Sequence, residues 1–178
     1  MATPTAEELQ QEGLRLFQEG LYDEAARRFS EALEHFSEEG RELETGEMLN
    51  NIGVIRRKQS RWDEALESLE EAHRVFERLG DRSRQAQSLG NMASVYASLK
   101  RRDEAVESWR KAAAIFAELD DRQRQGETLM AIGVSLFKTK QRQAGLAAYQ
   151  AGLEMLENPT VFQKFSRFMM AMQARLLH

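Results

Sequence analysis

The sequence predicts an all-α fold in which helix pairs stack one after another into a solenoid. Across its 178 residues the chain repeats with a period of 40, so that the tripeptide Asp-Glu-Ala at 23–25 returns at 63–65 and at 103–105. Apolar residues recur at the spacing of a helix, and the alternating runs of Val, Ile and Thr that indicate strands are missing. A strict repeat of this length is typical of a solenoid, in which each unit buries its apolar face only against its neighbours.

Four helix pairs are expected along the chain, at about residues 6–40, 43–80, 83–120 and 123–157. The first helix has a recognisable start, because Thr5 and Glu8 form a capping pattern in which each side chain satisfies a backbone amide of the other residue. The breaks between helices are expected, in chain order, at Gly20, Gly40, Ser60, Gly80, Arg101, Asp120-Asp121 and Gln141.

A further helix is expected over residues 160–176. Asn158-Pro159 ends the eighth helix, since proline cannot continue the hydrogen-bond ladder, and Thr160 can cap the next helix. The segment carries one apolar stripe, made of Phe162, Phe165, Met169, Met172 and Leu176. This stripe predicts a helix that caps the last pair, and together with Met1 it favours a nearly complete unit. The alternative is that the stripe pairs with another chain and makes a homodimer. The protein would then be a structural protein that forms homo-oligomers through this helix or through the ends of the solenoid.

Composition limits the classes of function. The formal net charge of −4 disfavours a general nucleic-acid or anionic-membrane role, and no stretch is long and apolar enough to span a bilayer. The chain contains no cysteine, which excludes disulfides, thiolate catalysis and cysteine zinc sites. Met1 to Gln10 show no signal peptide, so the expected location is cytoplasmic.

No motif in the chain indicates catalysis. His35, His73 and His178 are scattered, without a set of His, Asp and Glu at metal-ligand spacing. A glycine-rich phosphate loop and a nucleophile motif are also missing. We therefore expect that the protein is not an enzyme and that it uses no metal and no other cofactor.

A fixed register of small and large residues recurs in all four pairs. The first helix of each pair has one small residue, at Gly13, Gly53, Ala93 and Gly133. The second helix has two small positions, at Ala25/Ala32, Ala65/Ala72, Ala105/Ala112 and Gly145/Gly152, with a large residue between them at Phe29, Leu69, Trp109 and Tyr149. This register resembles the tetratricopeptide repeat family over about residues 6–157. The resemblance implies a right-handed α-solenoid of four antiparallel pairs, used as an adaptor or scaffold for protein binding.

The repeat departs from the usual form of that family in length. The period is 40 here, whereas the usual unit has about 34 residues, and the proline that commonly follows the second helix is absent. The chain is similar in this respect to the long-repeat branch typified by the Leu-Gly-Asn repeat protein and kinesin light chain. Leu89-Gly90-Asn91 and the linker at 79–82 carry that similarity.

The family resemblance implies a concave groove, lined by the first helix of each pair, that receives a peptide or helix of a partner protein. The groove positions are Gln10, Gln11, Leu14, Phe17, Asn50, Asn51, Val54, Arg57, Lys58, Gln87, Asn91, Ser94, Ser98, Met130, Val134, Phe137 and Lys138. Amide side chains both donate and accept hydrogen bonds, so they can hold the backbone of an extended peptide. Asn51 and Asn91 are the strongest candidates because they are equivalent in successive units. The alternative is that these amides are merely solvated residues of a helix face.

Three basic clusters, at 56–58, 100–102 and 138–140, recur near the period of the repeat. They could form a stripe along one edge that attracts an acidic partner. Cations at the ends of helices are also stabilised by the helix dipole alone, and the sequence favours this second explanation.

Overall fold

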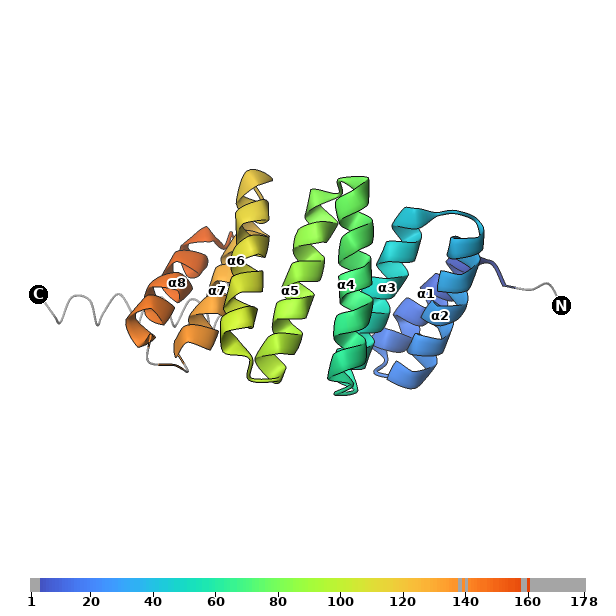
Figure 1. Cartoon of the computed structure of the whole chain (residues 1–178), viewed down its shortest axis with the longest axis horizontal. Coiled ribbons are helices and arrows are strands. Elements are labelled where there is room, and N and C mark those ends of the chain that lie inside the picture. Colours follow the sequence, from blue (N-terminus) through green and yellow to red (C-terminus); the bar gives the residue numbers. More distant parts are fainter. Residues whose placement is uncertain (1–3, 138, 140, 158–159, 161–178) are drawn as a thin grey trace, which may run out of the picture. The chain divides into compact units, whose positions relative to one another are not determined.

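The computed structural model describes residues 4–137, 139, 141–157 and 160, and this part of the chain is helical, without a strand. The prediction of an all-α fold is confirmed. The chain divides into two compact units, one that ends at Lys100 and one that begins at Arg101. The helices of the first unit (Figure 1) are α1 Ala6–Gln18, α2 Tyr22–Glu38, α3 Glu42–Lys58, α4 Trp62–Leu79 and α5 Arg82–Ser98. Those of the second unit are α6 Arg102–Glu118, α7 Arg122–Phe137 and α8 Arg142–Met155.

Packing within each unit runs between helices that are neighbours in the sequence. In the first unit each helix from α1 to α4 contacts the next one, and in the second unit α7 contacts both α6 and α8. The first unit also has a direct contact between α3 and α5, the first helices of successive pairs. Packing against sequence neighbours is the arrangement of a solenoid.

Left-handed residues close the turns at a constant interval. Six residues with φ between 54° and 79° occur at every twentieth position, at Gly20, Gly40, Ser60, Gly80, Lys100 and Asp120. After Gly20 the amide of Leu21 donates to the carbonyl of Leu16 at 2.9 Å, and the same bond follows Gly40, Ser60, Gly80 and Asp120. This geometry satisfies carbonyl groups that the helix end leaves open. The break that was expected at Arg101 is therefore centred one residue earlier.

Among the described helices, three starts have a side-chain cap. Thr5 Oγ1 accepts from the Glu8 amide at 3.2 Å while the Thr5 amide donates to Glu8 Oε2 at 2.8 Å, which confirms the predicted capping pattern. At α5, Asp81 Oδ1 accepts from the Arg84 amide at 2.9 Å. Asp121 Oδ1 accepts from the amide three residues later at the same distance, at the start of α7.

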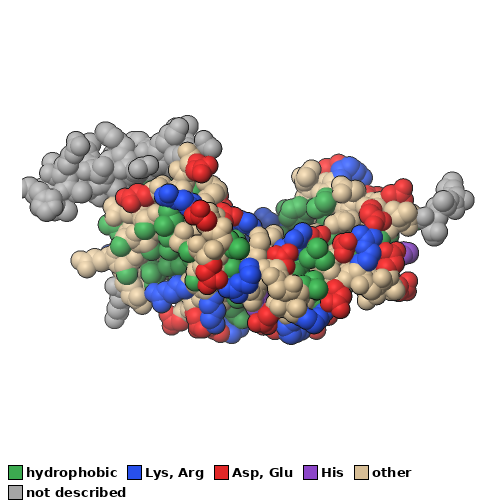
Figure 2. Space-filling model, turned by 90° about the horizontal axis from the view of Figure 1, so that it is seen from above, with side chains coloured by type: hydrophobic (Ala, Val, Ile, Leu, Met, Phe, Trp, Pro, Cys, Tyr) green, Lys and Arg blue, Asp and Glu red, His purple; other side chains and the backbone are tan. Residues whose placement is uncertain are grey.

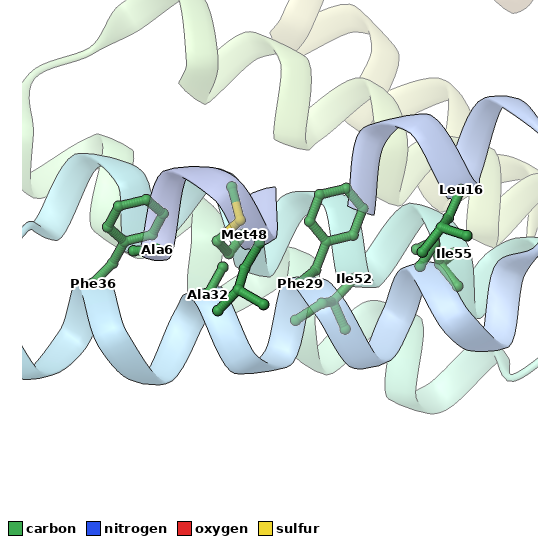
Figure 3. Packing of buried hydrophobic residues seen from close by; sticks show 10 residues of the cluster. Ala6, Leu16, Phe29, Ala32, Phe36, Met48, Ile52 and Ile55 are labelled. Carbon is green, nitrogen blue, oxygen red and sulfur yellow. The ribbon is translucent and has the colours of Figure 1, made fainter. Parts of the chain in front are cut away.

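The main core of the first unit lies between α1, α2 and α3. Figure 3 shows Phe29, Ala32 and Phe36 of α2 side by side with Met48 and Ile52 of α3. The two phenylalanines are at most 1% exposed, and Ala25 and Ala32, the two small positions of the register in α2, are fully buried. A further cluster joins α3 to α4 through Leu49, Ala72, Val75 and Phe76.

The predicted register of small and large residues is visible in the packing of each pair that can be compared. A Cβ atom added to Gly13 would lie 2.8 Å from a ring carbon of Phe29, and one added to Gly53 would lie 2.6 Å from Leu69 Cγ. In the last pair the backbones themselves are in contact, since a Cβ on Gly152 would lie 2.4 Å from the carbonyl oxygen of Gly126. Small residues are required here because larger ones would overlap their neighbours.

The helix that we predicted over residues 160–176, with its apolar stripe, lies outside the described residues except for Thr160. Among the helices that are described, none is long and apolar enough to cross a membrane.

Candidate functional site

The predicted binding residues of the first unit lie on α1, α3 and α5, and we call this set the amide face. Its members are Gln10, Gln11, Leu14 and Phe17 of α1, Asn50, Asn51, Val54, Arg57 and Lys58 of α3, and Gln87, Asn91, Ser94 and Ser98 of α5. Gln11, Lys58, Gln87 and Ser98 are exposed, Asn50 is buried, and the others are half-buried. The amide face therefore combines amide, hydroxyl, apolar and basic side chains, and all of them except Asn50 are at least partly exposed.

One hydrogen bond joins α3 to α5 on the amide face. Asn91 Nδ2 donates to Asn50 Oδ1 at 2.9 Å, and Asn50 is only 6% exposed. The sequence pointed to Asn51 and Asn91 because they occupy equivalent positions, whereas the structure links Asn91 to the residue before Asn51. Asn51 itself is half-buried.

The α1 part of the face is more apolar. Leu14 and Phe17 pack against the buried core, and the ring of Phe17 lies 5.7 Å from that of Tyr22 at the start of α2. On α5, Ser94 Oγ donates to the carbonyl of Gly90 at 2.9 Å, and Ser98 Oγ donates to the carbonyl of Ser94 at 2.9 Å. Both hydroxyl protons are therefore held by the helix, which leaves the oxygens as acceptors.

Ion pairs occupy two carboxylates in the N-terminal halves of α1 and α3. Glu7 accepts a hydrogen bond from the Arg41 guanidinium, and this bond is the main reason that the pKa of Glu7 lies below its ordinary value. Glu47 accepts from Arg84 Nε at 2.8 Å. Figure 2 shows acidic and basic side chains interspersed over the face of the molecule that it presents. Glu7 and Glu47 are thus each paired with an arginine of the next helix pair.

The basic cluster at the end of α3 divides into three different environments. Arg56 Nη1 donates to the carbonyl of Glu64 at 3.2 Å and to Ser68 Oγ at 2.5 Å, so Arg56 joins α3 to α4. Arg57 is half-buried, and its Nε is a buried atom without an acceptor among the described residues. Lys58 is exposed. Only the first of the three cations has a structural partner in the described part of the chain.

The candidates on α7 belong to the second unit. Met130 is half-buried, whereas Val134 is 47% and Phe137 is 56% exposed. Lys138 lies outside the described residues. The described part of the chain contains no group of three or more His, Asp or Glu side chains that could hold a metal ion.

Sequence reasoning missed the arginines that lie over the periodic phenylalanines. The guanidinium carbon of Arg41 lies 4.4 Å from the ring centre of Phe36, and that of Arg124 lies 4.8 Å from the ring centre of Phe116. The phenylalanines keep the period of 40, but the arginines follow them at intervals of 5 and 8 residues, as the numbering shows. A search for strict periodicity could not have found this pairing.

Comparisons with known proteins agree with this architecture. The chain has a TM-score of 0.78 with BtubC (BKLC) from P. vanneervenii, at 21% identity over 87% of this chain and 67% of that one. The apo form of RapI has a TM-score of 0.77 at 18% identity over 85% of this chain. This chain covers 42% of the RapI chain and thus spans less than half of it. MamA has a TM-score of 0.66 at 17% identity, over 84% of this chain and 77% of that one. At these identities the likeness shows a common fold.

No curated protein matches the sequence. The family model of the tetratricopeptide repeat matches residues 6–78 and 44–118, which together cover more than half of the chain. The matches include the pairs in which Gly13 meets Phe29 and Gly53 meets Leu69. This chain therefore belongs to the tetratricopeptide repeat family.

Proposed function

We propose that the protein is an interaction scaffold that holds an extended peptide or a helix of a partner protein on the amide face. Tetratricopeptide repeat proteins are in general adaptors without catalytic activity. The observation that carries the proposal is the hydrogen bond between Asn50 and Asn91. It brings together the amide groups of two successive first helices, α3 and α5.

The bond leaves hydrogen-bonding capacity for a ligand. It uses one of the two Nδ2 hydrogens of Asn91, and the Asn91 carbonyl oxygen remains able to accept from a peptide N–H. Asn51, which is half-buried and follows Asn50 in the sequence, can both donate and accept. Backbone groups of a peptide need such partners once they leave water, whatever the peptide sequence.

Peptides selected from a displayed random library on the full chain provide the test. We expect Asn51→Ala to weaken their binding about tenfold, because loss of a buried hydrogen bond costs about 1–3 kcal/mol. Its free energy of unfolding should stay within about 0.5 kcal/mol of wild type. Asn91→Ala should lose binding and about 1 kcal/mol of stability together, because Asn50 Oδ1 loses its donor.

Gln143→Ala is the matched control, since Gln143 is an exposed amide on α8, outside the amide face. It should bind every selected peptide like wild type. Peptides that bind Asn51→Ala as tightly as the wild-type chain would contradict the proposal.

A further inference from the structure

Of the two cations on the amide face, Arg57 is the one whose charge is least offset by water or by a hydrogen-bond partner. The face contains two cations, Arg57 and Lys58, and no carboxylate. Lys58 is exposed and can be hydrated, whereas Arg57 is half-buried with its Nε out of contact with solvent and without an acceptor in the described part of the chain. Buried N–H groups without an acceptor are rare in proteins because the loss of hydration is not offset.

The neighbouring charges cannot supply that acceptor. Glu7 and Glu47, on the helices α1 and α3 of the face, are engaged by Arg41 and Arg84, and Glu12, which follows Gln11, lies 3.0 Å from Arg28. Glu64, which faces the end of α3, accepts from Arg61 Nε at 2.7 Å and lies 3.9 Å from Arg56. Each of these acidic groups already has a cation, so Arg57 keeps a full positive charge for a ligand.

The positions of Arg57 and Asn50 along α3 set the distance between Arg57 and the Asn50–Asn91 pair. Arg57 follows Asn50 by seven residues, which is about two turns and about 10.5 Å along the helix axis, so both lie on the same side of α3. An extended peptide advances about 3.3 Å per residue. About three peptide residues therefore separate a backbone group held at Asn50 and Asn91 from a side chain at Arg57.

We propose that Arg57 binds the side-chain carboxylate of an acidic residue in the partner peptide, about three positions from the residue held by the Asn50–Asn91 pair. This inference rests on the proposed function. A carboxylate that meets the guanidinium edge-on accepts from Nε and one terminal nitrogen at once, the strongest geometry for this pair. Nε must turn outward to do so, and this movement breaks no hydrogen bond because Nε has none within the described residues.

The test selects random peptides fused at their C-termini to a phage coat protein, so that no terminal carboxylate is present. On the full wild-type chain we expect Asp or Glu to be enriched at one position of the selected peptides. The same selection on Arg57→Gln should lose that enrichment, and Arg57→Glu should replace it with Lys or Arg. For one selected synthetic peptide, exchange of the acidic residue for its amide should weaken binding to wild type about tenfold or more and leave binding to Arg57→Gln unchanged.

Arg74→Gln is the matched control, because Arg74 is an exposed cation on α4 without an ion pair or hydrogen bond in the described part of the chain. It changes the net charge equally and should keep the acidic preference. If the preference persists in Arg57→Gln, or disappears only in Lys58→Gln, the assignment to Arg57 is overturned. Peptides that depend on Asn51 but show no acidic preference overturn this inference alone. A wild-type chain that selects no peptide, or only peptides indifferent to Asn51→Ala, overturns the proposed function as well.

Discussion

Single residues at the turns show how this chain tolerates a conformation that glycine adopts most easily. The left-handed position holds Gly20, Gly40 and Gly80 in three turns, but Ser60, Lys100 and Asp120 in the others, with φ of 61°, 62° and 54°. A residue with a Cβ loses roughly 1–2 kcal/mol in this region. The turns at the non-glycine positions therefore hold strain that the packed helices on either side impose.

Replacing Ser60 by glycine should relieve this strain. We expect Ser60→Gly to raise the free energy of unfolding by about 0.5–1 kcal/mol, the conformational cost being partly offset by the greater freedom of glycine in the unfolded chain. Gly80→Ala is the reverse experiment at an equivalent turn and should lower the free energy of unfolding by about 1–2 kcal/mol. Urea unfolding monitored by circular dichroism measures both. Equal stability of Ser60→Gly and a Ser60→Ala control would contradict the explanation.

Helix glycines separate into two kinds according to the space beside them. A Cβ on Gly152 would lie 2.4 Å from the backbone oxygen of Gly126, whereas a Cβ on Gly90, also inside a helix, would meet nothing within 4 Å. Gly152→Ala should lower the melting temperature, at a cost of about 1–3 kcal/mol, because the two backbones must move apart. Gly90→Ala should raise stability by about 0.5–1 kcal/mol, because alanine favours the helix. Destabilisation of the same size in both variants would refute the close approach of α7 and α8.

At the scale of elements, the helices of the first unit are joined by charged residues near their ends as well as by apolar side chains. Asp81 caps α5, accepting from the Arg84 amide at 2.9 Å and from Arg84 Nη1 at 2.7 Å, while Arg84 also reaches Glu47 of α3. Partial burial raises the pKa of Asp81, but the bonds from Arg84 outweigh this effect, so the pKa lies below its ordinary value.

This arrangement makes stability depend on pH in a defined direction. The carboxyl of Asp81 binds a proton less readily in the folded chain, so its contribution is present above the ordinary pKa of 3.8 and is lost as the pH falls through the lowered value. Asp81→Asn keeps a cap but loses the charge, and should be less stable at neutral pH by about 0.5–1 kcal/mol. The difference from wild type should shrink steadily as the pH falls below 3.8.

Denaturant titrations at several pH values measure this difference. Asp103→Asn, at an exposed position in the first turn of α6 with no hydrogen bond in the described residues, is the control and should show a smaller effect. A pH-independent difference between wild type and Asp81→Asn would show that the ionised cap contributes nothing.

For the whole molecule, the described helices form two compact units, each with its own packing between sequence neighbours. The first unit carries most of the candidate binding residues, and the second carries Met130, Val134 and Phe137 on α7. The apolar stripe predicted at 160–176 lies outside the described residues except for Thr160, and we expect it either to cover the last pair or to join two chains.

Truncation after Pro159 distinguishes these hypotheses. If the stripe is a cap, as the sequence favours, the truncated chain should aggregate from a monomeric parent, because the apolar face of the last pair loses its cover. If the stripe joins two chains, truncation should convert a dimer into a well-behaved monomer. Static light scattering on both chains gives the answer, and two equally stable, soluble monomers would contradict both hypotheses.

The sequence alone determined the helical class, the cap at Thr5 and the positions of most turns. These features depend on local properties, namely helical spacing of apolar residues, capping chemistry and the small residues that close packing requires. The packing of Gly13 against Phe29 and of Gly53 against Leu69 was predictable for the same reason, since these small and large residues recur at a fixed interval.

Only the tertiary structure decided which polar groups meet across helices. Asn91 reaches Asn50 and not its periodic equivalent, and Glu7 and Glu47 pair with arginines 34 and 37 residues away. Arg56 is bound to α4 while Arg57, its neighbour, keeps a buried Nε without an acceptor in the described part of the chain. Long polar side chains can reach several partners from one helix position, so the choice among them depends on how the helices pack and not on the repeat.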